Sequence, residues 1–374
     1  MFTKSVIAAF TMVVASVGEL NAQSVLPRFT SVTAGSAHFC AIDTERAIYC
    51  WGDNQWGQLG NHTTVSSPLV PIRITSLQGF RQVVAGSTHT CALTVDGYPY
   101  CWGSDQAGVM GGAAGRETCT GLPCSTEPMP AAIGRRFDSL TAGFEHMCGL
   151  TSGAVSCWGR GDAGQLAPRA NDPQHAADAL HFTAASARGD HTCALASGEA
   201  WCWGANDRGE LGEPATEHGS ATIKASTSKF TQLATAAFYT CGVTTVGKVE
   251  CWGANDVAQL GAENLRATRA TVQSPDGGRF TRVSVGGLHT CAVAESGRVY
   301  CWGSDAQKRL GGEPTGTCNG QLCSAMPVVV TLPAKVTEIA VGGSMACAVG
   351  ETGTIYCWGG AASARVPITV AVHP

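Results

Sequence analysis

The chain has 374 residues, of which 44% are hydrophobic and 14% are charged, with a formal net charge of −4. This composition favours a compact, well-buried β protein over a disordered chain. The basic residues form no long cluster, so the electrostatic footprint of a nucleic-acid partner is absent. The eighteen cysteines form an even, regularly spaced set. They predict a disulfide framework and therefore an oxidising compartment.

The N-terminus predicts export. Lys4 gives a short positive start, residues 5–17 form an uncharged apolar run, and residues 20–22 resemble a small-residue cleavage site. We interpret residues 1–22 as a signal peptide, since the apolar run is too short for a good membrane span. The mature chain, residues 23–374, is then expected to be a secreted or periplasmic single domain and a monomer, without a membrane span after signal cleavage.

The next feature is a tandem repeat. Residues 40–60 read CAIDTERAIYCWGDNQWGQLG, and the Cys-Trp-Gly in this stretch occurs seven times in the chain, at intervals of 45 to 56 residues. The seven copies begin at Cys50, Cys101, Cys157, Cys202, Cys251, Cys301 and Cys357. A period of roughly 40–50 residues is typical of a propeller or a solenoid.

Each unit predicts four short strands. In the first unit these are residues 29–35, 38–43, 47–52 and 69–74, with a loop that contains Gly-Gln-Leu-Gly before the last. Seven such units predict an all-β protein, a seven-bladed β-propeller. The units cover approximately residues 28–75, 79–133, 136–180, 181–225, 229–273, 279–332 and 335–372. The sequence leaves open whether the blades coincide with these units or are offset.

The central hairpin of each unit predicts a disulfide. If Cys91 faces Cys101, the hairpin closes with a three-residue loop that ends in Gly97, and glycine is normal there because φ is positive. Directly opposed residues that are not hydrogen bonded lie close enough for a bridge. The predicted pairs are Cys40/Cys50, Cys91/Cys101, Cys148/Cys157, Cys193/Cys202, Cys241/Cys251, Cys291/Cys301 and Cys347/Cys357.

Inserts in units two and six hold the other four cysteines, Cys119/Cys124 and Cys318/Cys323. Four thiolates suffice for a zinc ion. The two inserts lie three blades apart, however, and an oxidising compartment favours a local disulfide within each insert. We expect disulfides, no metal and no cofactor. A stapled insert is also suited to rigid recognition, because less entropy is lost on binding.

Two residue types recur in the units. Histidine precedes the first hairpin cysteine by two positions in five units (His38, His89, His146, His191 and His289). A metal ring is one interpretation. Tyr239 and Met345 interrupt it, so we expect each histidine to fix a turn inside its own blade. The tryptophan after each second cysteine is either a stacking ladder or packing between blades, and its presence in every unit favours packing.

The loop after the first Cys-Trp-Gly holds the candidate binding residues Asn54, Gln55 and Trp56. The other units have small or polar residues at the position of Trp56, and interfaces favour tryptophan. A merely packed tryptophan is the alternative. Acidic residues follow the tryptophan of most units, and we expect them to cap turns. They are Asp53, Asp105, Asp162, Asp207, Asp256 and Asp305.

The repeat resembles a known family. Residues 86–93 (Gly-x-x-His-x-Cys-Ala-Leu), 297–303 and 54–60 (Asn-x-x-Gly-Gln-Leu-Gly) are similar to the regulator of chromosome condensation repeat. The resemblance covers residues 29–372 and implies a seven-bladed β-propeller, similar to secreted, cysteine-stapled bacterial members. One member of that family is a nucleotide-exchange factor for a small GTPase, and a secreted bacterial member inhibits β-lactamases through a loop-rich face.

The sequence shows no set of residues for catalysis, neither a Gly-x-Ser-x-Gly elbow nor a His-Glu-x-x-His motif. We therefore expect no enzyme, but a secreted scaffold that binds a protein partner through variable loops, including an inhibitory role. A lectin-like propeller that binds polysaccharide or a cell surface is the alternative. Exchange-factor activity ranks lower because it rests on the family name.

Overall fold

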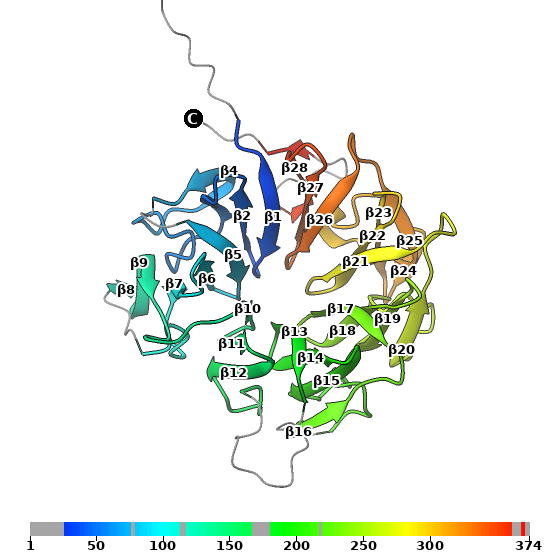
Figure 1. Ribbon diagram of the computed structural model, residues 1–374. Coiled ribbons are helices and arrows are strands. Elements are labelled where there is room, and N and C mark those ends of the chain that lie inside the picture. The colour runs from blue at the N-terminus through cyan, green and yellow to red at the C-terminus, as the bar shows by residue number, and fades with distance from the viewer. Residues whose placement is uncertain are drawn as a thin grey trace, which may run out of the picture.

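The computed structural model describes residues 26–75, 79–112, 117–166, 180–216, 219–360 and 368–370. These residues form seven antiparallel sheets arranged as a ring around a central channel (Figure 1). The expected all-β, seven-bladed β-propeller is confirmed. The predicted signal peptide lies outside the described residues. Within the described ranges, no helix is long and apolar enough to span a bilayer.

The first four blades differ in the number of their described strands, which are named in the order of their hydrogen bonding. The first contains β1 (Phe29–Ala34), β2 (His38–Asp43), β3 (Ile48–Gly52) and β4 (Ser67–Arg73). The second contains β5 (Phe80–Ala85), β6 (His89–Thr94), β7 (Pro99–Ser104), β9 (Leu122–Pro130) and β8 (Glu117–Cys119). The third contains β10 (Ser139–Ala142), β11 (His146–Thr151) and β12 (Ala154–Gly159). The fourth contains β13 (Phe182–Arg188), β14 (His191–Ala196), β15 (Glu199–Gly204) and β16 (Gly219–Lys224).

The remaining three blades follow the same plan. The fifth contains β17 (Phe230–Thr235), β18 (Tyr239–Thr244), β19 (Val249–Gly253) and β20 (Arg269–Val272). The sixth contains β21 (Phe280–Val285), β22 (His289–Ala294), β23 (Val299–Ser304), β25 (Gln321–Val330) and β24 (Gly316–Cys318), with a 3-10 turn η2 (Ala306–Lys308). The seventh contains β26 (Val336–Val341), β27 (Met345–Gly350), β28 (Ile355–Gly359) and β29 (Ile368–Thr369).

The ring closes by packing between its first and last blades. Each sheet takes its described strands from one repeat unit, so the blades coincide with the units. The backbone N–H of Phe29 donates to the carbonyl of Gly353 at 2.8 Å. Phe39 and Trp51 share one buried cluster with Met345. Figure 1 shows β1 beside β26. The first and last blades therefore protect each other's inner strands by apolar packing, and neither sheet combines strands from both ends of the described chain.

The hairpin register is the one that the cysteine spacing predicts. Cys91 pairs with Cys101, and the loop between these strands ends at Gly97 with φ of 86°. Arg46 takes the corresponding left-handed conformation in the first blade, with φ of 67°, although it is not glycine. The first hairpin therefore keeps the same loop conformation and the same register as the others, although Arg46 replaces the usual glycine.

All eighteen cysteines lie in nine pairs at disulfide distance, in the predicted pairing. The Cα atoms of the hairpin pairs are 4.0–4.1 Å apart. Those of the two insert pairs are 5.7–5.8 Å apart. Because every sulfur has a partner, the insert cysteines offer no thiolate to a zinc ion.

The repeated tryptophans pack between blades, as predicted. Trp102 shares a cluster with Cys40, Ile48 and Leu59 of the preceding blade. Six of the seven indoles are fully buried, and Trp158 of the third blade is half-buried. Each blade therefore contributes one large side chain to the core that it shares with its neighbour.

Candidate functional site

The antiparallel strands give the ring two distinct ends. The turns between the first and second strands of the blades lie at one end, together with the loops after the third strands. We call this end the loop face. It includes residues 35–37, 86–88, 143–145, 189–190, 236–238, 286–288 and 342–344. The turns between the second and third strands lie at the opposite end, the hairpin face. Both cysteine inserts and Trp56 belong to the loop face.

The three candidate binding residues differ in exposure. Asn54 is fully buried: its Oδ1 accepts a bond from the N–H of Leu59 at 2.9 Å, and its Nδ2 donates to the carbonyls of Thr63 and Val65. Asn54 therefore shapes the loop and cannot reach a partner in this conformation. Gln55 is exposed and Trp56 is half-buried, so these two side chains remain available for contact.

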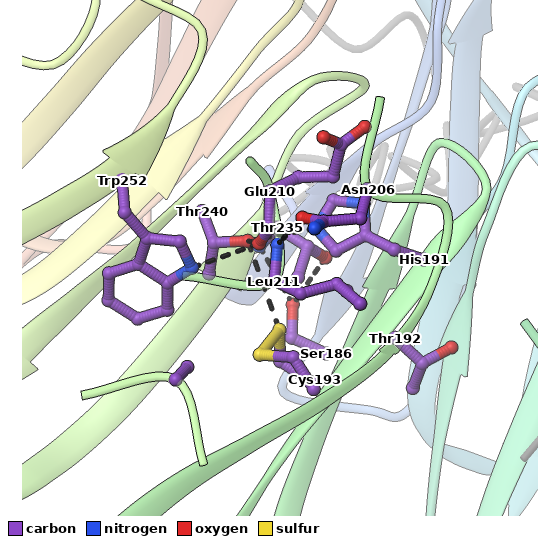
Figure 2. Close-up of a disulfide and its surroundings, with 12 residues drawn as sticks. Ser186, His191, Thr192, Cys193, Asn206, Glu210, Leu211, Thr235, Thr240 and Trp252 are labelled. Atoms are coloured by element: carbon purple, nitrogen blue, oxygen red, sulfur yellow. Dashed lines mark hydrogen bonds between the residues drawn. A yellow bond between two sulfur atoms is a disulfide. The ribbon is translucent and has the colours of Figure 1, made fainter. Parts of the chain in front are cut away.

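The repeated Gly-Gln-Leu-Gly segment is held by the next blade. The carbonyl of Gln58 accepts hydrogen bonds from the indole Nε1 of Trp102 at 2.9 Å and from the hydroxyl of Thr90 at 2.8 Å. The fourth and fifth blades repeat the arrangement: Figure 2 shows Trp252 and Thr240 directed at the carbonyl of Glu210. These described loops are therefore fixed from a neighbouring blade, which makes this part of the loop face rigid.

Four of the five recurrent histidines, all except His289, contact a side chain of the neighbouring blade, so the expectation that they act inside their own blade is wrong. His38 Nε2 lies 2.8 Å from the hydroxyl of Thr90, and His191 Nε2 lies 2.8 Å from that of Thr240 (Figure 2). The cause is the ring geometry, which places the start of each second strand against the next blade. Burial lowers the pKa of His38, His146 and His191 to about 3, so these rings are neutral at physiological pH.

The acidic residues after the tryptophans occupy three different positions of the loop. Asp105 and Asp305 accept bonds from the N–H groups of Met110 and Leu310, as the capping interpretation predicts. Asp53 accepts a hydrogen bond from the hydroxyl of Ser66. The other three are exposed and lie one position further along the loop than Asp105 and Asp305, and their role in capping stays a prediction. They are Asp162, Asp207 and Asp256.

The third and fourth blades give the loop face an acidic sector. Asp190 lies near Glu145, Asp162 and Asp207, with Arg160 as the neighbouring cation. Burial raises the pKa of Asp190, and the surrounding carboxylates add to this while Arg160 opposes it. Arg160 pairs with Asp162 and Glu145. The partly paired carboxylates favour a basic contact surface on any partner that covers this sector.

Each cysteine insert packs on the loop of the preceding blade. The N–H of His62 donates to the carbonyl of Thr126, at the base of the first insert. Cys318 and Cys323 of the second insert share a small cluster with Ala258 of the fifth blade, and Asn319 Nδ2 donates to the carbonyl of Asp256 at 2.9 Å. The inserts thus extend the loop face in two sectors and are braced against it.

Two exposed apolar residues in turns of the loop face were missed by sequence reasoning. Phe238 is 48% exposed and Leu288 is 37% exposed. They lie in adjacent blades, at the position just before the recurrent histidine or tyrosine. Ala37, Thr88 and Ser344 stand at that position in other blades. Aligning the units on the residue after each first turn would have found both, since only this alignment shows that they are unusual.

Comparison with known proteins agrees with the fold and the repeat. Two profiles described as "Regulator of chromosome condensation (RCC1) repeat" match the chain, one at residues 47–93 and 296–349, the other at residues 29–58, 80–109 and 280–307. A segment of 151 residues is 33% identical to the probable E3 ubiquitin-protein ligase HERC3 of Homo sapiens, and one of 142 residues is 34% identical to the ultraviolet-B receptor UVR8 of Arabidopsis thaliana. The segments cover 40% and 37% of this chain, but only 14% and 31% of those proteins.

Solved structures share the propeller at low sequence identity. Human WBSCR16 superposes with a TM-score of 0.73 at 17% identity, covering 87% of this chain and 88% of that one. Prp20p of Saccharomyces cerevisiae, studied for its binding to Gsp1p and histones, gives 0.69 at 19% identity, covering 84% and 80%. The solved structures show the class of fold, a seven-bladed propeller, and segments of this propeller match the RCC1 repeat.

Proposed function

We propose that this propeller is an exported, non-catalytic scaffold that binds a protein partner through its loop face. The observation that carries the proposal is the concentration of variable elements on that face. The Trp56 loop, both braced inserts and the exposed pair Phe238 and Leu288 all lie there. The repeated core supports them through bonds between blades, so the surface is pre-organised and little entropy is lost on binding.

The proposed compartment rests on the cysteines. Nine pairs at disulfide distance leave no cysteine of the chain unpaired, and such a framework persists in an oxidising environment. Peptide mapping of the protein without reduction tests this. Nine bridges in the pairing described above are expected from protein isolated from its native compartment. Free thiols in that material would contradict export.

The binding proposal is tested by capture. The oxidised protein, immobilised, is exposed to secreted and envelope fractions of its source, and retained proteins are identified by mass spectrometry. Variants with Trp56→Ala or with Phe238→Ser and Leu288→Ser together are expected to lose the partner. Tyr98→Ala and Val246→Ser change exposed residues of the hairpin face and are the matched controls.

Two results would overturn the proposal. If the hairpin-face variants lose the partner and the loop-face variants keep it, the partner binds the opposite end of the ring. If the oxidised protein retains polysaccharide and no protein, the lectin-like alternative replaces a protein scaffold. A reduced and alkylated sample shows whether retention depends on the native fold.

A further inference from the structure

The central channel contains one unusual side chain, Arg188 at the end of β13. The corresponding position in the other six blades holds glycine or alanine: Gly35, Gly86, Gly143, Ala236, Gly286 and Gly342. A cavity of about 190 Å3 runs along the inner strands, and Arg188 is the one charged residue among the described residues that line it. The repeat thus leaves space into which a single guanidinium projects.

The contacts of Arg188 cross the channel. One terminal nitrogen donates to the carbonyls of Val341 at 2.8 Å and Val285 at 3.3 Å, and the other donates to the carbonyl of Gly35 at 2.9 Å. A guanidinium has five N–H donors, so these three bonds leave two. No carboxylate from the described residues lines the cavity. The positive charge of Arg188 is therefore held by neutral carbonyls, and none of the described lining residues carries a negative charge.

Hydroxyl groups line the same cavity. Thr141 Oγ1 accepts a bond from the N–H of Ala187 at 2.8 Å, and Ser284 Oγ accepts one from the N–H of Val341 at 3.0 Å. Accepting those bonds leaves each O–H hydrogen able to donate. Thr33 adds a third half-buried hydroxyl. A half-buried site with hydroxyl and guanidinium donors and no acidic group suits an anion, because charge-assisted bonds of this kind are the strong ones.

The ends of the inner strands restrict the size of the ligand. At the loop face, Gly343 donates to the carbonyl of Ser36 at 3.0 Å and Phe144 donates to that of Gly189 at 3.0 Å, so turns of neighbouring blades meet around the channel. Burial lowers the pKa of Arg188 to about 10, which leaves it cationic at neutral pH. The cavity thus combines a permanent charge with room for a few heavy atoms.

We propose that the channel binds a small inorganic oxyanion of the phosphate or sulfate class, held by Arg188 and by the hydroxyls of Thr33, Thr141 and Ser284. The proposal is independent of the partner that the loop face binds. Because Arg188 links the fourth blade to carbonyls of the first, sixth and seventh, an ion bound there neutralises the charge at a point where four blades meet. The bound ion therefore stabilises the closed ring.

The experiment measures the melting temperature of the oxidised protein by calorimetry while sodium sulfate, and separately sodium phosphate, replaces sodium chloride at constant ionic strength. The protein is expected to melt at least about 2 °C higher in saturating oxyanion, as for any ligand of the native state. Isothermal titration with sulfate gives the dissociation constant. Arg188→Gln should weaken sulfate binding by on the order of tenfold or more, since it removes a charge-assisted donor.

Two further variants keep the test decisive if Arg188→Gln does not fold. Thr33→Val removes one hydroxyl with little change in shape and should weaken sulfate binding roughly threefold to tenfold. Arg160→Gln removes an exposed arginine of the loop face and should leave binding unchanged. Crystals soaked in selenate should show an anomalous peak within hydrogen-bonding distance of the Arg188 guanidinium. Equal melting temperatures in chloride and sulfate, equal losses in Arg160→Gln and Thr33→Val, or a selenate peak only elsewhere would overturn the proposal.

Discussion

The third and sixth blades share a repeat pattern and differ in the burial of its recurrent positions and in their described strands. The described part of the third blade has three strands, and its Trp158 and Cys157 are half-buried. The sixth blade has five strands, a stapled insert, and a Trp302 and Cys301 that are fully buried. Both keep the first three strands in the same register. The comparison teaches that the repeat specifies the inner three strands of both blades, while the sixth blade adds a stapled insert at its outer edge.

The largest expected effect on stability comes from replacing the repeated tryptophan, and it should differ between these two blades. Trp302→Ala should lower the free energy of unfolding by about 3–5 kcal/mol, because it leaves a cavity in the core shared with the fifth blade. Trp158→Ala should cost less, about 1–3 kcal/mol, because part of that indole is already exposed and the site can relax. Urea denaturation of both variants measures the difference. Equal losses would mean that the third blade is as tightly packed as the sixth.

Acid should destabilise the ring through its buried histidines. Burial lowers the pKa of His146 to about 3, well below the value near 6.5 in the unfolded chain. The unfolded state therefore binds protons first, and stability falls as the pH drops below 6.5. By pH 5 each such histidine contributes a loss of about 2 kcal/mol. Urea denaturation midpoints at pH 7 and pH 5 measure this loss of stability. Most carboxylates titrate below about pH 5, so they contribute little to a change in this range.

Methionine variants test whether the buried histidines cause this loss of stability in acid. Met345 already occupies the same position in the seventh blade, so the fold accepts methionine there. His146→Met loses the bond to Thr192 and should cost about 1 kcal/mol at pH 8. His289→Met should cost nothing or stabilise, because neither ring nitrogen of His289 has a partner among the described residues. Both variants should reduce the loss between pH 7 and pH 5. An unchanged pH profile would show that other groups cause the acid effect.

The hairpin disulfides should differ in reactivity. Cys157 is half-buried, whereas Cys291 and Cys301 are fully buried. Mild reductant followed by alkylation and mass spectrometry should modify the Cys148/Cys157 pair first, because thiol attack requires access. Replacing either pair with alanines should cost less than the roughly 2–4 kcal/mol typical of disulfides, since the closed loop is short. Earlier reduction of the Cys291/Cys301 pair would show that the disulfide of the sixth blade is the more accessible one, which contradicts this prediction.

A small effect on stability is expected from removing the staple of an insert. Replacing Cys318 and Cys323 with alanine should change the free energy of unfolding by less than about 1 kcal/mol, because the insert lies outside the inner three strands. The same change should weaken partner capture if the insert is a recognition element. A large loss of stability, measured by urea denaturation, would show that the second insert is part of the core.

The sequence by itself determined the number of units, the hairpin register and the pairing of the cysteines. These features are local: a three-residue loop with Gly97 and two cysteines ten residues apart allow one register. The same locality explains why the tryptophans could be assigned to packing. Every unit has this tryptophan, and every blade packs against a neighbour, so packing between blades is the role that all copies can share.

Only the tertiary structure decided which blade each polar group serves. His38 bonds Thr90, 52 residues away, and Arg188 reaches carbonyls up to 153 residues away. It also decided that Asn54 is buried, whereas Phe238 is exposed. A linear repeat gives the same position the same local surroundings. Closing the ring brings different neighbours against each copy, and burial and charge follow from those neighbours.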